Sequence, residues 1–347
     1  MRHHYAPTVR REIAEQPEAV ARLLEDADGA IAAAARAIAE DQTQYVVIAA
    51  RGSSDNAARY AQHVLGRLCG LPVALATPSL HTVYDAPLRY DGGVAIGISQ
   101  SGASPDVVGV LDAARDQGRP AIAITNDAGS PLAEAATHVI PLRAGTEESV
   151  AATKTYTTSL AAAAALAAAV ADDRGRLREL QAAPDALARQ LQRTDGLDEA
   201  AEAASGWRRL AVIGRGANYA TAFEAALKIK ELAGVAAEPA SPADFLHGPV
   251  AMLEPGFPVL AILPSGPAGP AVREVIDAAR DRGAELTVIG GDEAGPGERV
   301  LAVEPGPEWL SPLCAVVPAQ LLAVGAAERR GLDADRPAGL QKVTRTT

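Results

Sequence analysis

The sequence predicts an α/β protein of two tandem, doubly wound parallel-sheet domains of the flavodoxin-like type, related by internal duplication. The first observation is a repeat: YVVIAARGSSDNAARYA (45–61) is echoed by RLAVIGRGANYATAFEA (209–225), at an offset of 164 residues. A second pair, LDAARDQG (111–118) and IDAARDRG (276–283), is offset by 165 residues. The other observation is that short apolar runs alternate with helical segments in each copy. Such alternation is typical of a parallel sheet with helices on both faces.

Each copy contains three predicted strands. In the first copy they are Tyr45–Ala49, Gly93–Ile98 and Ala121–Thr125, and in the second copy Leu210–Ile213, Val259–Leu263 and Leu286–Ile289. A glycine turn follows the first strand of each copy. A Ser-Gly step follows the second strand, ahead of a helical stretch that is predicted at Pro105–Ala114 in the first copy. Doubly wound sheets bind their ligands at the carboxyl ends of the strands, so these turns are the expected binding region.

The repeat divides the chain into five predicted segments. They are a helical lead-in (1–28), a first domain that binds phosphate (29–172), a helical connector (173–196), a second domain (197–328) and a C-terminal tail (329–347). The connector is charged, but its Leu and Ala residues recur at helical spacing, so we expect a helix there. The apolar tract 160–171 is mostly alanine and about half as long as a membrane-spanning helix, which favours a tightly packed helix.

Composition and charge argue against several classes of function. The net charge of −11 and a pI near 5.1 are unlike the basic surfaces that bind nucleic-acid phosphates, so no nucleic-acid partner is expected. No apolar run follows the opening MRHHYAPTVRRE, so we expect no signal peptide, no membrane association and a cytoplasmic location. Cys69 and Cys314 lie far apart without the spacing of a zinc site and are expected to be small core residues. We expect no metal and no cofactor.

Hydroxyl-rich loops follow the first two predicted strands of the first copy. Hydroxyl groups and unpaired N–H groups at helix N-termini together bind anions without a lysine. The alternative is ordinary helix capping, for which one serine at each turn suffices. Two hydroxyl-rich loops in one domain favour a phosphate site, and its candidate residues are Ser53, Ser54, Ser99, Gln100, Ser101 and Ser104.

The second copy provides an internal control for this interpretation. Its matching loops read Gly216-Ala217-Asn218 and Pro264-Ser265-Gly266-Pro267-Ala268, so most hydroxyls are gone and prolines remove N–H donors. If the fold itself needed the serines, the second copy should have kept them. The sequence therefore predicts one phosphate site per chain, in the first copy.

Lysine is rare in this chain. Of 32 basic residues only Lys154, Lys228, Lys230 and Lys342 are lysines, and lysine can form a Schiff base or transfer a proton where arginine cannot. Lys228 and Glu231 are spaced i, i+3 and so lie on one helix face; a surface salt bridge is the alternative reading of this pair.

Histidine provides one further candidate for proton transfer. His247 lies beside Gly248-Pro249, and its ordinary pKa suits proton transfer near neutrality. We expect structural roles for His63 and His138, and His81 is left open.

Taken in order, GSS, SQSGAS, EESVAATKTYTT, EAALKIKE, FLHGP and LQKVT resemble the sugar isomerase (SIS) domains of glucosamine-6-phosphate synthase and its amino-sugar-phosphate relatives. The likeness covers roughly residues 10–347, including the lead-in RREIAEQPEAV. It implies a homodimer that binds a hexose or hexosamine 6-phosphate at the first domain.

The resemblance also implies a role for each candidate residue. The serines and Gln100 would hold the phosphate, with Val150 close to the sugar. Glu231 would move the proton between C1 and C2, with Lys228 beside it. His247, from the neighbouring subunit, would assist ring opening, and Lys342 in the C-terminal tail would reach the carbonyl end of the sugar.

Two departures from the family pattern concern the sugar contacts. VAATK stands where VASTK is usual, so Ala152 lacks a hydroxyl, and PAGLQKV replaces PRNLAKS. No glutaminase domain precedes residue 10, so we expect that the chain does not release ammonia from glutamine. The expected reaction is therefore conversion of glucosamine 6-phosphate to fructose 6-phosphate and ammonia.

Four alternatives stay open. The substrate could be a fructosamine 6-phosphate or galactosamine 6-phosphate. The chain could instead be a non-catalytic phosphosugar sensor, or an aminotransferase that works with a separate glutaminase. A sensor would need the serines but not Glu231, His247 and Lys342, so their joint presence favours catalysis.

Overall fold

A computed structural model describes residues 7–40, 42–291 and 295–342 of the chain. The chain forms two compact units. Among the described residues, the leading unit contains residues 16–40, 42–147, 154–184 and 341–342, and the trailing unit contains residues 7–15, 148–153, 185–291 and 295–340.

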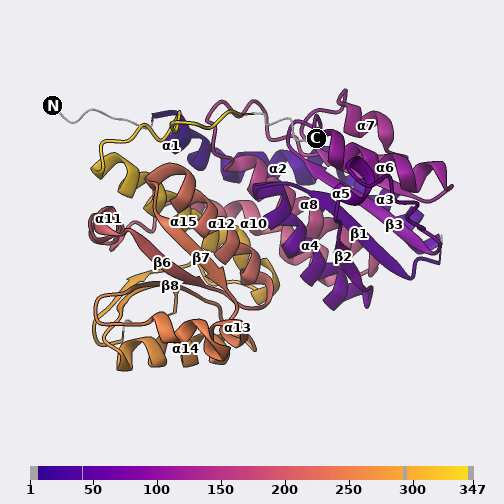
Figure 1. The fold of residues 1–347 in the computed structure, drawn as a ribbon. Coiled ribbons are helices and arrows are strands. Elements are labelled where there is room, and N and C mark those ends of the chain that lie inside the picture. The colour runs from indigo at the N-terminus through magenta and orange to yellow at the C-terminus, as the bar shows by residue number, and fades with distance from the viewer. Residues whose placement is uncertain (1–6, 41, 292–294, 343–347) are drawn as a thin grey trace. The chain divides into compact units, whose positions relative to one another are not determined.

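The leading unit is built on a five-stranded sheet in the order β2-β1-β3-β4-β5, with all strands parallel (Figure 1). The strands are β1 (Tyr45–Ala50), β2 (Val73–Leu75), β3 (Gly93–Ser99), β4 (Ala121–Thr125) and β5 (His138–Pro141). From β1 the chain runs outward to β2 and then returns past β1 to β3. This reversal places the crevice of a doubly wound sheet at the carboxyl ends of β1 and β3.

Helices cover both faces of the leading sheet. On one face, α6 (Pro105–Asp116) and α7 (Pro131–Ala135) pack on a core that includes Ala95, Leu111 and Leu132. On the other face, α4 (Ser53–Cys69) packs against the sheet and against α8 (Lys154–Val170). The remaining helices are α2 (Gln16–Asp26) and α3 (Asp28–Glu40), which pack on α8, and the short α5 (Ser79–Thr82) beside α6. Because both faces are covered, the central strands β3 and β4 are buried at every residue.

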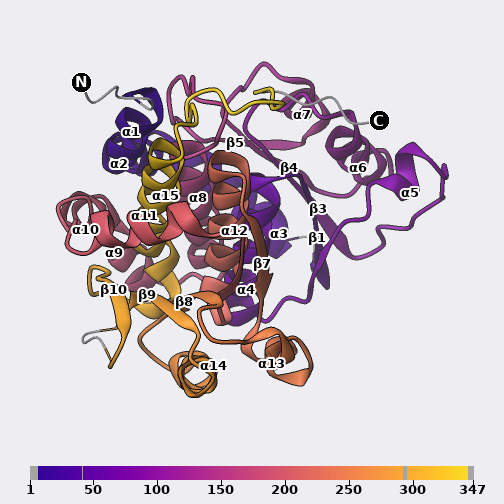
Figure 2. The ribbon, with the colours of Figure 1, turned by 60° about the vertical axis from the view of Figure 1, so that its left-hand side comes forward.

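The trailing unit repeats this plan with the strand order β7-β6-β8-β9-β10, again all parallel (Figure 2). Its strands are β6 (Arg209–Ile213), β7 (Ala236–Ala240), β8 (Pro258–Leu263), β9 (Glu285–Gly290) and β10 (Glu298–Leu301). The helices α12 (Tyr219–Ala233) and α15 (Ser311–Arg329) pack together, and α11 (Leu197–Gly206) packs on α15. The helices α13 (Pro242–His247) and α14 (Gly269–Asp281) contact each other around a core that contains Phe245 and Val275. Short elements complete the unit: α1 (Pro7–Ala14), η1 (Gly216–Asn218), η2 (Pro249–Met252) and η3 (Glu308–Leu310).

The predicted fold class is confirmed, and each of the six predicted strands is present within one residue at either end. The predicted helix at Pro105–Ala114 is α6, which continues to Asp116. The helical connector contains α9 (Arg174–Gln181) and α10 (Ala183–Gln190). The edge strands β2, β5, β7 and β10 were not predicted, because three to five residues that are only partly buried give little periodic signal.

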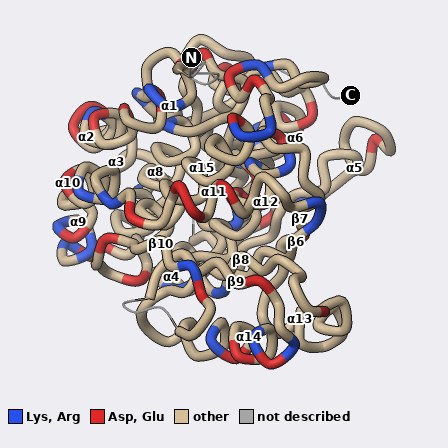
Figure 3. The backbone as a smooth tube through the Cα atoms, turned by 90° about the vertical axis from the view of Figure 1, so that its left-hand side faces the viewer, with Lys and Arg blue, Asp and Glu red and all other residues tan. Residues whose placement is uncertain are grey.

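Two helices of unusual composition form the inside of the units. The alanine-rich helix α8 is buried along nearly all its length in the leading unit, as the packed-helix prediction requires. In the trailing unit, the segment Glu308–Arg329 is long and apolar enough to cross a membrane, but 89% of its most apolar window is buried. Figure 3 shows charged residues gathered on α14, whereas α15 carries few. Such burial is typical of a core helix.

Candidate active site

The crevice of the leading unit lies where two helices begin after neighbouring strands. The loop after β1 leads through Gly52 into α4, and the loop after β3 leads through Ser99–Ser104 into α6. Gly52 has a φ of 56°, a left-handed conformation that glycine adopts without strain. Both helices therefore begin at the same edge of the sheet, where the positive ends of their dipoles stabilise an anion.

Ser104, at the crevice, is not an ordinary helix cap. Ser130 and Ser241 are examples of ordinary serine caps, because their hydroxyls accept from the backbone N–H groups of Ala133 and Asp244. Within the described part of the chain, the hydroxyl of Ser104, which precedes α6, accepts no such bond. This observation weakens the capping alternative at that loop.

The loop after β3 is held in one conformation by its own hydroxyls and by the chain beside it. Gly102 N donates to Ser99 Oγ at 3.1 Å, and Ala103 N donates to Ser101 Oγ at 3.3 Å. Gly102 has a φ of 61°, and a Cβ at this position would lie 2.0 Å from Ser130 Oγ. The loop is thus rigid, and the hydroxyl hydrogens of its serines can donate to a bound anion.

An ion pair that the sequence reasoning missed joins the two loops of the crevice. Arg51 Nε and Nη2 lie 2.7 and 2.6 Å from Asp106 Oδ2, and the Asp106 side chain is only 1% exposed at the start of α6. The Arg51 side chain is half exposed and belongs to the loop that precedes α4. The signal that could have revealed it is an arginine directly before the glycine turn, together with an aspartate in the first turn of the second helix.

A second charged contact in the leading unit lies at the beginning of α8. Lys342 Nζ is 2.8 Å from Glu147 Oε2, and the Glu147 side chain is completely buried. Glu147 also accepts hydrogen bonds from Thr155 N at 3.1 Å and from Thr155 Oγ1 at 2.7 Å. The C-terminal tail is therefore anchored beside this helix by Lys342. Sequence reasoning singled out Lys342 but missed its carboxylate partner.

In the trailing unit, α12 carries a buried charged cluster. Lys228 is 1% exposed and lies between Glu224 Oε1 at 3.6 Å and Glu231 Oε2 at 2.5 Å. Glu224 is completely buried, whereas 25% of the Glu231 side chain is exposed. In a surface salt bridge both partners are exposed to water. Because Lys228 is buried, its pair with Glu231 is not the surface salt bridge that was the alternative to a catalytic role. Glu231 is therefore the member of the cluster that solvent reaches.

The other candidates of the trailing unit lie on separate elements. His247 is the last residue of α13 and is exposed. Val150 is partly exposed, and its backbone N–H donates to the carbonyl oxygen of Asp335 at 3.2 Å. The structure thus pairs Lys228 with Glu231 in the trailing unit and Lys342 with Glu147 in the leading unit, where the serine loops follow neighbouring strands.

His81, which the sequence left open, is part of a small aromatic contact. Its ring stacks on Tyr90, and Nε2 lies 3.0 Å from the Tyr90 hydroxyl. Burial lowers the pKa of His81 below its ordinary value, so the ring is neutral at pH 7. Of the other histidines, His63 is partly buried on α4, with Nδ1 2.8 Å from the carbonyl oxygen of Arg59. These contacts are consistent with structural roles.

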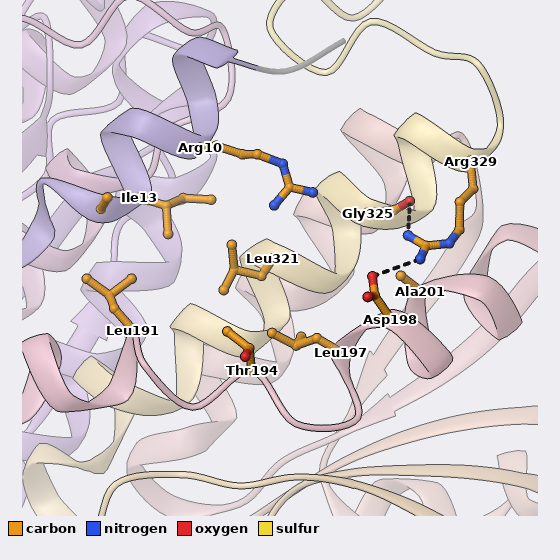
Figure 4. Close-up of a pocket in the computed structure, with 11 residues that line it drawn as sticks. Arg10, Ile13, Leu191, Thr194, Leu197, Asp198, Ala201, Leu321, Gly325 and Arg329 are labelled. Atoms are coloured by element: carbon orange, nitrogen blue, oxygen red, sulfur yellow. Dashed lines mark hydrogen bonds and ion pairs between the residues drawn. The ribbon is translucent and has the colours of Figure 1, made fainter. Parts of the chain in front are cut away.

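A cavity of 390 Å³ in the trailing unit does not have the chemistry of a sugar-phosphate site. Most of the residues around it are apolar, and they come from α1, α11, α15 and the segment before α11 (Figure 4). Both cations at its rim are already paired: Arg10 with Glu328 at 2.6 Å, and Arg329 with Asp198 at 3.0 Å. Because a phosphate needs donors that are not neutralised, we do not assign the cavity to the candidate site.

The fold and the crevice define a class: a tandem pair of doubly wound domains in which the crevice loops of the leading copy are rich in hydroxyls. The SIS domain family matches this chain twice, at residues 41–169 and 205–327. The chain belongs to the SIS domain family.

Individual relatives agree with this assignment. Glutamine–fructose-6-phosphate aminotransferase (isomerizing) of Zymomonas mobilis is 32% identical over 98% of this chain. A crystal structure from Silicibacter pomeroyi, which carries the provisional name phosphosugar isomerase, is 39% identical with a TM-score of 0.88 and covers 94% of this chain and 99% of its own. The C-terminal domain of the Francisella tularensis glucosamine-fructose-6-phosphate aminotransferase is 26% identical with a TM-score of 0.86, over 96% of this chain and 98% of its own. The match spans 59% of the length of the Zymomonas mobilis relative.

Proposed function

We propose that this protein is a phosphosugar isomerase that binds a hexose or hexosamine 6-phosphate and transfers a proton between its C1 and C2 carbons. The observation that carries the proposal is Glu231: a quarter-exposed carboxylate held 2.5 Å from the completely buried ammonium of Lys228. A positioned carboxylate is a suitable general base for a 1,2-proton shift. The names of two relatives support the substrate class, since one is an isomerizing aminotransferase of fructose 6-phosphate and the other carries a phosphosugar isomerase name.

In this proposal the phosphate binds in the crevice of the leading unit. Its oxygens accept from the hydroxyls of the serine loops and from the N–H groups at the starts of α4 and α6. Arg51 adds a positive charge at the rim, although Asp106 neutralises much of it. The proposed phosphate ligands are Ser53, Ser54, Ser99, Gln100, Ser101 and Ser104.

The proton chemistry is assigned to residues of both units. Glu231 removes the proton from C2 of the open-chain sugar and returns it to C1, while Lys228 holds its carboxylate in place. His247 of the neighbouring subunit of a homodimer protonates the ring oxygen as the pyranose opens. Val150 lies beside the sugar. Lys342 reaches the carbonyl end, where it must first give up its proton, since an ammonium paired with Glu147 is not a nucleophile.

The finer reaction that we propose is deamination of glucosamine 6-phosphate. The open-chain amino sugar transfers its C2 proton to C1, which leaves an imine at C2, and water then hydrolyses this imine to fructose 6-phosphate and ammonia. Ala152 stands where the related synthases have a serine. This loss of a hydroxyl near the sugar is the observation that keeps fructosamine 6-phosphate and galactosamine 6-phosphate as second substrates.

An assay over a panel of sugar 6-phosphates tests the proposal. The panel contains glucosamine, galactosamine and fructosamine 6-phosphates, glucose 6-phosphate and fructose 6-phosphate, and both ammonia and ketose phosphate are measured. We expect ammonia and ketose phosphate in equal amounts from glucosamine 6-phosphate. Isomerisation of a sugar phosphate without ammonia release would support the isomerase proposal and contradict the deamination proposal. Tight binding without turnover of any sugar would contradict catalysis and identify a sensor.

A further inference from the structure

The helix α1 is held within the trailing unit by contacts to three different parts of the chain. Arg10 donates from Nε and Nη2 to the two carboxylate oxygens of Glu328 on α15, at 2.9 and 2.6 Å. Figure 4 shows Arg10 reaching from α1 toward α15. At the start of the helix, Thr8 N and Val9 N donate to the carboxylate of Asp335 at 3.1 and 2.8 Å. These two contacts hold the helix against α15 and Asp335. The third contact is made by Glu12, and it holds a different segment of the chain.

Glu12 binds the segment Glu148–Thr153, which lies immediately before α8 in the chain. Its side chain is completely buried and accepts hydrogen bonds from three donors: Glu148 N, Ser149 N at 3.2 Å and Ser149 Oγ. Burying a carboxylate is costly unless its oxygens are fully hydrogen-bonded. An apolar side chain would pack α1 against the unit at a lower cost in free energy. The buried carboxylate is therefore explained by its hydrogen bonds to Glu148 and Ser149.

The segment is fixed at consecutive residues by two different partners. Glu12 holds Ser149, and the carbonyl oxygen of Asp335 accepts from Val150 N at 3.2 Å. Ser149 Oγ also lies 2.9 Å from the carbonyl oxygen of Ala151, a second acceptor within reach of its one hydrogen. The backbone on both sides of Val150 is therefore determined by α1 and by the C-terminal segment, while the Val150 side chain stays partly exposed.

We propose that Glu12 is a positioning residue for the sugar end of the active site. It holds Glu148–Thr153 in the conformation that presents Val150 to the substrate, and it acts through hydrogen bonds to Glu148 and Ser149 rather than by contact with the sugar. The inference rests on the proposed function, which places the sugar beside Val150. It makes the N-terminal helix a supporting part of the active site.

Binding of two ligands to three proteins tests this role. Glucitol 6-phosphate reports the sugar and phosphate contacts together, and inorganic phosphate reports the phosphate contacts alone. Glu12→Gln places an amide N–H group against the donors of Ser149. The control, Arg10→Met, removes the contact of the same helix with Glu328 and leaves the contacts of Glu148–Thr153 unchanged. We expect Glu12→Gln to bind glucitol 6-phosphate at least about tenfold more weakly and inorganic phosphate unchanged, because displacing a supporting segment by about 1 Å carries large penalties. Arg10→Met should bind both ligands as the parent does.

Hydrogen exchange of the Ser149 and Val150 amides separates this role from loss of fold. In Glu12→Gln we expect faster exchange at these two amides, with protection in β6 and β8 retained. Ser149→Ala removes one donor only and should shift both readouts in the same direction by less. Equal loss of both ligands, or the same losses in Arg10→Met, would overturn the inference. A parent protein that binds neither ligand would instead overturn the proposed function, while the exchange result would still decide whether Glu12 holds the segment.

Discussion

The helices α4 and α12 occupy the same place in the two copies, and comparing them separates what the fold requires from what is specific to one copy. The offset of 164 residues places Tyr60, Val64 and Arg67 of α4 opposite Glu224, Lys228 and Glu231 of α12. Tyr60 and Val64 are buried, as are Glu224 and Lys228. The fold therefore needs buried side chains at these positions but not charged ones. The charges on α12 add nothing that the fold needs, which favours a chemical role.

The crevices of the two copies also differ, but here the leading copy carries the polar groups that are specific to one copy. In the leading copy, Gly52 is followed by two serines, and Gly102 lies between Ser101 and Ser104. In the trailing copy, the side chain of Glu308 lies over the matching glycines: a Cβ on Gly216 would be 3.3 Å from its Oε1, and one on Gly266 would be 3.4 Å from its Cγ. A carboxylate of the chain itself thus lies at the trailing crevice and repels a second anion. The proposed function uses this difference: it places the phosphate in the leading copy and the proton-transfer groups in the trailing copy.

The largest expected effect comes from the charged member of α12 that solvent reaches. Glu231→Gln should lower kcat by about 10²- to 10⁴-fold, because it removes the general base. Binding of glucitol 6-phosphate should persist. Arg67→Gln, at the matching position of α4, is the control and should retain parental kcat. Steady-state kinetics and calorimetry on both variants check this, and loss of ligand binding together with activity in Glu231→Gln would indicate a structural role instead.

The next effect is on affinity and distinguishes the two crevices directly. Ser101→Ala and Ser104→Ala should each raise KM by about tenfold or more, because a hydrogen bond to a charged group is worth about 1.5–3 kcal/mol. Ser265→Ala, at the position of the trailing copy that matches Ser101, should leave KM unchanged. An unchanged KM in both Ser101→Ala and Ser104→Ala would contradict the proposal that this loop binds the phosphate.

A smaller effect concerns the glycines of the loops that follow β3 and β8. Gly102→Ala should destabilise the protein by about 2–4 kcal/mol, since the left-handed backbone is strained for alanine and the new methyl group would overlap Ser130 Oγ. Gly266→Ala meets only the flexible Glu308 side chain at 3.4 Å and should cost about 1–2 kcal/mol. Urea unfolding of the two variants measures the difference. Equal losses would show that the two loops are packed alike.

The smallest expected effect compares one thiol in each unit. Burial raises the pKa of Cys69, on α4, to about 11 and that of Cys314, on α15, to about 12. Both thiols therefore stay protonated at pH 8, and modification by a thiol reagent should be slow and become faster as the pH rises toward these values. Cys69 is only half-buried and should react before Cys314. Faster reaction at Cys314 would show that the trailing unit opens more readily than its packing implies.

The sequence predicted the central strands and the asymmetry of the crevice loops, because both are written in local patterns. Apolar runs mark β3 and β8, and hydroxyl-rich turns mark Ser99–Ser104. The edge strands were not predicted because their partly exposed residues lack such a pattern. The buried carboxylates of the leading crevice, of the start of α8 and of α1 were not predicted for a different reason. Asp106, Glu147 and Glu12 meet their partners across 55, 195 and about 136 residues of sequence, and no local spacing records such contacts.

Counting and locating the bound phosphosugar tests the central claim most directly. Calorimetry with glucitol 6-phosphate should give one molecule per chain, and a crystal structure of the complex should place its phosphate among Ser99–Ser104 with Glu231 directed at C1 and C2. The contradicting result is a molecule in the trailing crevice, where a 240 Å³ cavity lies beside Pro264 and Gly290, or a Glu231 directed away from the sugar in every subunit.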